Sequence, residues 1–168
     1  MIPDKYLYIS PRQASQTLIT HILEAMEKEP ERPFTIALSG GTTPAVLFEV
    51  WEREFAAYTP WARLYFYWVD ERCVPPTDAQ SNFGLADRLL FGKINLPASH
   101  YYRIVGEGAP GEEAILYSSL VKATVPTVDD VPIFDFVLLG VGEDGHTSYN
   151  TKSKIGILLL FFLTGKTC

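Results

Sequence analysis

The chain has 168 residues, of which 47% are hydrophobic and 20% are charged, a length typical of a single globular domain. Its 14 lysine and arginine residues are outnumbered by 20 aspartate and glutamate residues, which gives a net charge of −6 at pH 7. A nucleic-acid-binding surface needs an excess of basic residues, so we expect no nucleic-acid partner. Twelve glycines and twelve prolines also exclude a collagen-like or low-complexity chain.

The two cysteines and the apolar runs indicate the compartment. Cys73 and Cys168 have the spacing of neither a metal site nor a disulfide framework, and we expect Cys73 to be a half-buried apolar residue. No basic stretch followed by an apolar run begins the sequence, as it would in a secretory signal. The longest apolar run, residues 155–163, is shorter than the about 20 residues of a membrane-spanning helix. We therefore expect a cytoplasmic protein with no membrane partner.

Helical and extended patterns alternate along the chain. Apolar residues three or four apart predict helices, and short runs rich in β-branched and aromatic residues predict buried strands. In chain order, the predicted elements are a helix capped by Ser10 from Pro11 to about Lys28, a strand at 34–38, a helix from Thr43–Pro44, a strand at 64–69, a helix at 82–91, a weaker strand at 101–105, a helix from Pro110 and a strand at 134–139.

This alternation predicts a three-layer α/β fold of the Rossmann-like kind, with a mostly parallel sheet and helices on both faces. In such folds, ligands bind outside the C-terminal ends of the strands, near the point where the strand order reverses. Three polar segments follow three of the predicted strands. They are therefore the candidates for a functional site.

The first segment is Ser39-Gly40-Gly41-Thr42, between a strand and a helix. Two glycines allow a tight turn that presents backbone N–H groups, and a helix N-terminus favours an anion. This pattern indicates a phosphate-binding loop, although it matches neither the P-loop nor the dinucleotide-binding spacing. A plain strand-to-helix turn with a threonine N-cap is an equally good interpretation.

The second segment is Asp70-Glu71-Arg72, directly after the aromatic strand. An arginine at a strand end can hold a phosphate or carboxylate with two hydrogen bonds, and a nearby aspartate can orient a group or accept a proton. The alternative is a solvated loop that begins with a local ion pair.

The third segment, residues 140–148, contains His146 among glycines and small polar residues. Histidine suits general base catalysis near neutral pH, and Asp144, Glu143 or Asp70 could orient its ring. A lone histidine in a loop is more often without a catalytic role, but its place at a third strand end favours function. His21 and His100 are expected to be structural.

Together these segments resemble the 6-phosphogluconolactonase family, within the group that includes glucosamine-6-phosphate deaminases. The resemblance rests on Ala37–Pro44, Trp68–Pro76 with Ser81–Asn82, and Leu138–Ser148. It implies a fold of the sugar-phosphate isomerase type and hydrolysis of 6-phospho-D-glucono-1,5-lactone to 6-phospho-D-gluconate in the oxidative pentose phosphate pathway, without metal or cofactor. The deaminase is the alternative. Arg72 and Thr147 favour the lactonase, because deaminases usually have an aromatic residue and isoleucine at these positions.

The resemblance also implies a role for individual residues. His146 would be the general base, with Asp70 and Arg72 as its catalytic partners; whether Arg72 holds the phosphate or the oxyanion stays open. The implied substrate-binding residues are Ser39, Gly40, Gly41, Thr42, Arg72, Asp144, Gly145 and Thr147. The partner would be a small sugar-phosphate lactone, and we expect a monomer, with weak self-association as the alternative.

The resemblance ends at Ser148. We expect one domain at residues 1–148 and a divergent tail at 149–168, because three lysines and no acidic residue lie between His146 and Cys168. The family pattern would continue with further helices and strands, so the sequence predicts a fold that is incomplete at its C-terminus. An inactive family fragment, or a sugar-phosphate-binding protein without catalysis, are therefore alternatives to the enzyme.

Overall fold

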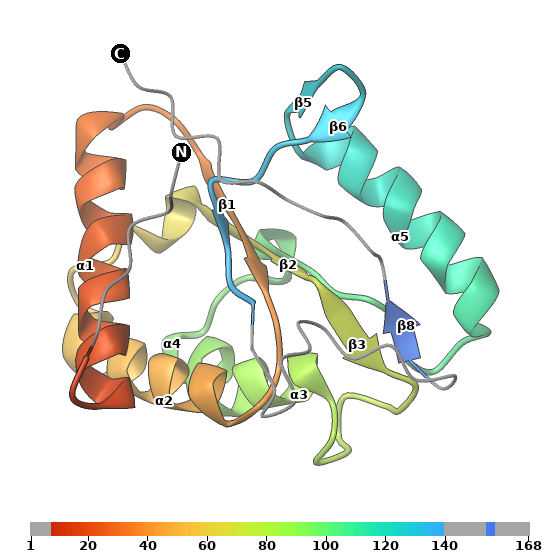
Figure 1. Ribbon diagram of the computed structural model, residues 1–168, viewed down its shortest axis with the longest axis horizontal. Helices are drawn as coiled ribbons and strands as arrows, with labels where there is room; N and C mark the ends of the chain where they lie inside the picture. The colour runs from red at the N-terminus through yellow and green to blue at the C-terminus, as the bar shows by residue number, and fades with distance from the viewer. Residues whose placement is uncertain (1–7, 140–153, 157–168) are drawn as a thin grey trace.

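A computed structural model of the chain describes residues 8–139 and the backbone of residues 154–156 (Figure 1). Its helices are α1 (Pro11–Lys28), α2 (Thr42–Val50), α3 (Asn82–Ala86), α4 (Gly92–Ile94) and α5 (Pro110–Thr124), with π-helical turns η1 (Trp51–Phe55) and η3 (Asp87–Phe91) and 3₁₀ turns η2 (Trp61–Arg63) and η4 (Ala98–His100). Its strands are β1 (Phe34–Leu38), β2 (Leu64–Trp68), β3 (Asp70–Arg72), β4 (Tyr101–Tyr102), β5 (Thr127–Val128), β6 (Val131–Pro132), β7 (Phe136–Val137) and β8 (Lys154–Gly156). None of the helices in the described part of the chain is long and apolar enough to span a membrane.

The central sheet has the strand order β4-β2-β1-β7, and each neighbouring pair is parallel. At its centre Ile36 of β1 lies between Phe66 of β2 and Phe136 of β7. The chain moves outward from β1 to β2 and β4, and then returns to place β7 on the other side of β1. The strand order therefore reverses between β1 and β7, which puts the expected ligand crevice at the C-terminal ends of these two strands.

Helices cover both faces of this sheet, as the alternating pattern predicts. Phe66 of β2 packs against Trp51 and Phe91, which follow α2 and α3 in the layer that also holds α1. Its neighbour Tyr67 points the other way and donates a hydrogen bond to Thr124 of α5 at 3.1 Å. Figure 1 shows α5 on the opposite side of the sheet from α1 and α2. The three-layer α/β fold is thus confirmed.

The described strands differ from the predicted ones in three places. The strands expected at 101–105 and 134–139 are shorter, as β4 and β7, because each pairs with only two residues of its neighbour. The segment from Asp70 is a strand, β3, and pairs with β8. The β5–β6 hairpin was not predicted, and it turns at Asp129 and Asp130, which both adopt positive φ.

The hydroxyl group of Tyr117, on α5, bridges the C-terminal ends of β2 and β4. It accepts a hydrogen bond from Trp68 N at 2.7 Å and lies 3.2 Å from Trp68 O and 3.1 Å from Tyr102 O. Burial raises the pKa of Tyr117 above its usual range, so the hydroxyl keeps its proton and can donate to these carbonyls. One side chain on α5 therefore fixes the ends of β2 and β4.

Replacing Tyr117 by phenylalanine should lower the free energy of unfolding by about 1–3 kcal/mol. The substitution keeps the ring but leaves the buried Trp68 N–H without its acceptor. Urea denaturation followed by circular dichroism measures the change. Tyr58, which is 77% exposed, offers the matched control, and Tyr58→Phe should leave the midpoint unchanged. Equal midpoints for the two variants would contradict the role of the Tyr117 hydroxyl.

Candidate functional site

The first predicted segment forms the turn from β1 into α2. Gly41 occupies the N-cap of α2 with φ of 113° and ψ of −172°, a backbone conformation that favours glycine. No side chain caps the helix, so the interpretation with a threonine N-cap is wrong: Thr42 is already the first helical residue. The first N–H groups of a helix have no partner within it, so this turn presents donors at the end of β1.

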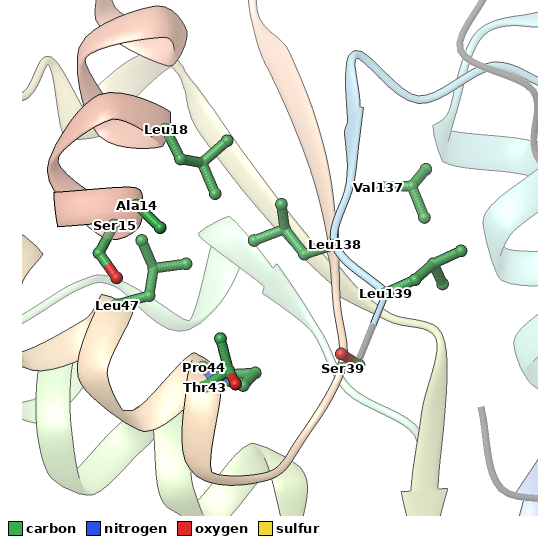
Figure 2. Close-up of a pocket in the computed structure, with 10 residues that line it drawn as sticks. All are labelled: Ala14, Ser15, Leu18, Ser39, Thr43, Pro44, Leu47, Val137, Leu138 and Leu139. Atoms are coloured by element: carbon green, nitrogen blue, oxygen red, sulfur yellow. The ribbon is translucent and has the colours of Figure 1, made fainter. Parts of the chain in front are cut away.

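Ser39 lies between β1 and this turn and borders a cavity of about 290 Å³. The cavity lies among α1, α2 and the end of β7, and Figure 2 shows Ser39 beside Leu139. Among the described residues, the buried Ser39 Oγ has no hydrogen-bond partner. Most of the lining is apolar, from side chains such as Leu18, Leu47 and Leu138, so the cavity does not suit a sugar phosphate. The polar turn beside the cavity suits a phosphate better, because it presents the N–H groups at the start of α2.

The second predicted segment is buried rather than solvated. Asp70 is 5% exposed and Glu71 is 2% exposed, which makes the interpretation as a solvated loop wrong. This segment continues beyond β2 as β3 and pairs with β8, and the carboxylates of Asp70 and Glu71 both contact Asn82 at the start of α3. The acidic side chains therefore lie inside the fold, where each needs hydrogen-bond donors.

Glu71 finds these donors at the beginning of α3. Its carboxylate accepts hydrogen bonds from Asn82 N at 2.7 Å, Phe83 N at 2.8 Å and Ser81 Oγ at 3.1 Å. It also accepts one from Arg72 N at 2.7 Å. A carboxylate at a helix N-terminus satisfies N–H groups that have no partner within the helix, and it interacts favourably with the helix dipole. Glu71 is therefore an anchor between β3 and α3.

Asn82 joins the first two segments, a role that the sequence alone did not reveal. Its Nδ2 donates to Asp70 O at 2.9 Å and lies 3.4 Å from Asp70 Oδ1. On its other side, a Cβ added at Gly40 would lie only 1.7 Å from Asn82 Oδ1. Gly40 is thus glycine because the Asn82 side chain occupies that space. Ser81–Asn82 forms part of the family resemblance in the sequence, but that resemblance assigned Asn82 no role.

Substituting Gly40 by alanine should lower the free energy of unfolding by about 1–3 kcal/mol, because the new methyl group displaces the Asn82 side chain from Asp70. Chemical denaturation measures this change. The control is Gly111→Ala in α5, where an added Cβ meets nothing within 4 Å. That control should be neutral or stabilising, since alanine favours helix more than glycine. Similar midpoints for both variants would contradict the close approach of Asn82 to Gly40.

Arg72 is a basic residue at this end of the sheet. It lies on β3, two residues beyond Asp70, and is partly exposed. Its buried Nε has no hydrogen-bond partner within the part of the chain that the structure describes. A guanidinium suits a phosphate or a carboxylate. The structure thus brings the Ser39–Thr42 turn, Asp70 and Asn82 together, with Arg72 next along β3.

Other predicted residues lie elsewhere or outside the described residues. His146, Asp144, Gly145 and Thr147, with Glu143, fall outside them. His100 is structural as predicted: its Nδ1 lies 3.0 Å from Leu64 O and its ring stacks on Tyr65. Cys73 is half-buried and packs against the core. Among the described residues, no group of three or more histidine, cysteine, aspartate or glutamate side chains is arranged to hold a metal ion.

Comparisons with known proteins place this arrangement in a family. The sequence pattern of the family described as "Glucosamine-6-phosphate isomerases/6-phosphogluconolactonase" matches residues 10–148. A 6-phosphogluconolactonase of Treponema pallidum is 46% identical over 113 residues, which are 67% of this chain and 47% of that protein. The one of Haemophilus influenzae is 40% identical over 117 residues, 69% of this chain and 49% of that protein.

A solved structure agrees with these relatives. The 6-phosphogluconolactonase of Trypanosoma brucei superposes with a TM-score of 0.76 at 27% identity, over 88% of this chain and 62% of that one. The chain spans about half the length of the curated relatives that it matches. Both the sequence and the parallel sheet with its two helical layers lead to one assignment. The chain belongs to the glucosamine-6-phosphate isomerase/6-phosphogluconolactonase family.

Proposed function

We propose that this protein hydrolyses 6-phospho-D-glucono-1,5-lactone to 6-phospho-D-gluconate. The observation that carries the proposal is the junction of the Gly40–Thr42 turn with Asp70 through Asn82, at the C-terminal ends of the strands. Relatives that are 40–46% identical and are named 6-phosphogluconolactonase support the choice of substrate. The proposed location is cytoplasmic, and the proposed state is a monomer.

The turn and Arg72 supply the binding chemistry. The N–H groups at the start of α2 and the helix dipole favour the phosphate dianion, with Ser39, Gly40, Gly41 and Thr42 forming the loop. The guanidinium of Arg72 adds charge and directed donors, either to the phosphate or to the oxyanion that forms on the lactone carbonyl. A donor to the oxyanion stabilises the transition state by about 3–4 kcal/mol.

The proposed chemistry needs one base and no metal or cofactor. His146 takes a proton from water as the water oxygen attacks the carbonyl carbon, and the carbonyl oxygen becomes the oxyanion. When the carbonyl re-forms, the bond to the ring oxygen breaks, and that oxygen takes up a proton as the new hydroxyl. Asp70 and Asp144 orient groups in the site, and Gly145 and Thr147 contact the substrate beside His146.

Lactone hydrolysis produces a carboxylic acid, so titration at constant pH measures the reaction directly. We expect proton release well above the rate without protein, and a higher melting temperature when 6-phosphogluconate is present. Ammonia release from glucosamine 6-phosphate without lactonase activity would overturn the proposal in favour of a deaminase. Stabilisation by 6-phosphogluconate without turnover of the lactone would contradict hydrolysis and favour a sugar-phosphate-binding protein without catalysis.

A further inference from the structure

We infer that Asn82 is a positioning residue, which fixes the Asp70 carboxylate relative to the turn at Gly40. This inference rests on the proposed lactone hydrolysis at the same site. Asn82 is attached to both segments: its amide nitrogen faces Asp70 and its amide oxygen faces Gly40. It would act on the reaction through Asp70, without contacting the lactone.

The backbone of Asn82 is held firmly in place. Its N–H donates to Glu71 Oε1 at 2.7 Å, and it is the first residue of α3, directly after the N-cap Ser81. Ser81 Oγ in turn accepts a hydrogen bond from Gly84 N at 2.9 Å. The residue is only 4% exposed, so water does not compete for its side chain. The amide group therefore starts from a fixed Cα and has little freedom to turn.

The orientation of the amide follows from its neighbours. Nδ2 lies near two oxygens of Asp70, the backbone carbonyl at 2.9 Å and Oδ1 at 3.4 Å. Turning the amide over would place its oxygen against both of these acceptors, so the donor must face Asp70. Asn82 thus holds Asp70 in one orientation, through contacts with both its backbone carbonyl and its carboxylate.

The side chain also sets the distance between the two segments. Because Asn82 Oδ1 lies where a Cβ of residue 40 would be, the turn approaches Asp70 only with glycine at this position. Asparagine supplies both a donor on one side and a compact oxygen on the other. Leucine has a similar shape but no donor, and aspartate would place a second negative charge beside Asp70.

The first test replaces Asn82 by aspartate, which keeps the shape and removes the donor. We expect kcat for the lactone to fall by about 10- to 100-fold with KM changed much less, because the aligned Asp70 contributes to orientation of the reacting groups. We also expect the acidic limb of the pH profile to move to higher pH, because a second negative charge beside Asp70 raises the proton affinity of the neighbouring groups of the site, the base included. Gln80→Glu, which adds the same charge at an exposed position nearby, should leave both unchanged.

If Asn82 had only a structural role, its replacement by aspartate would not shift the pH profile of kcat. An unchanged acidic limb in Asn82→Asp, or the same shift in Gln80→Glu, would therefore overturn the action of Asn82 on Asp70. A fall in kcat with a shifted limb in the first variant alone supports it.

A second test does not depend on activity. The unfolding of Gly40→Ala, Asn82→Ala and the double variant forms a cycle, and the double variant should be less destabilised than the sum of the single variants, because removing the Asn82 side chain makes room for a Cβ at residue 40. Additive effects would overturn the inference whether or not the protein is a lactonase. If the wild-type protein lacks lactonase activity, the proposed function fails, while the coupling of Asn82 to Gly40 is still decided by this cycle.

Discussion

With His146 replaced by alanine, kcat for hydrolysis of 6-phospho-D-glucono-1,5-lactone should fall by about 10²–10⁴-fold. Water is a poor nucleophile at neutral pH unless a base removes its proton as it attacks the carbonyl carbon. Histidine is the side chain whose ordinary pKa allows this near pH 7. The turn at Gly40 and Arg72 would still bind the sugar phosphate, so the KM should change far less than kcat.

Titration at constant pH gives both constants, after subtraction of the rate without protein. The pH dependence provides a second measure: the wild-type rate should rise through the titration of a base, and the alanine variant should lack that limb. His21, which is exposed on α1, provides the control, and His21→Ala should retain the wild-type rate. A His146→Ala variant within a factor of ten of the wild type would contradict the role of His146 as the base.

The sequence predicted the fold well where the signals are local. Ser10 and Pro11 begin α1 as predicted, with the Ser10 side chain accepting a hydrogen bond from Gln13 N, and β1 has the predicted bounds. Prolines and glycines delimit these elements, so their ends are encoded nearby. The lengths of β4 and β7 depend instead on how many residues their neighbours offer for pairing, and that information lies in distant parts of the chain.

The sequence predicted that two of the polar segments lie at one end of the sheet, but not how they are connected. The Ser39–Thr42 turn and Asp70 do lie at the same end of the sheet, as the rule for parallel α/β folds requires. The part played by Glu71 and Asn82 depends on contacts over 11 and 12 residues, made only when α3 packs against β3. From a run of three charged residues alone, one could not predict that the middle residue, Glu71, accepts hydrogen bonds from the first N–H groups of α3.

The largest loss of stability should follow from Glu71→Ala. Removing the carboxylate leaves Asn82 N, Phe83 N and Ser81 Oγ without their acceptor in a buried place. An unsatisfied buried donor costs about 1–3 kcal/mol, and the three losses add only in part, so we expect a decrease of about 3–5 kcal/mol in the free energy of unfolding. Since domains of this size are stable by about 5–15 kcal/mol, the variant should be close to unfolding.

Urea denaturation with two companion variants separates this role from a general effect of losing an acidic residue. Glu31→Ala removes an exposed carboxylate and should leave the midpoint unchanged. Glu71→Gln retains an acceptor oxygen and should lose less stability than the alanine variant, so it gives a measurable transition even if Glu71→Ala does not fold.

Because Glu71 also holds the backbone of Asn82, the glutamine variant should weaken the contact of Asn82 with Asp70 and lower kcat as well. If Glu71→Ala unfolds at the same urea concentration as Glu31→Ala, the anchor between β3 and α3 does not exist as described.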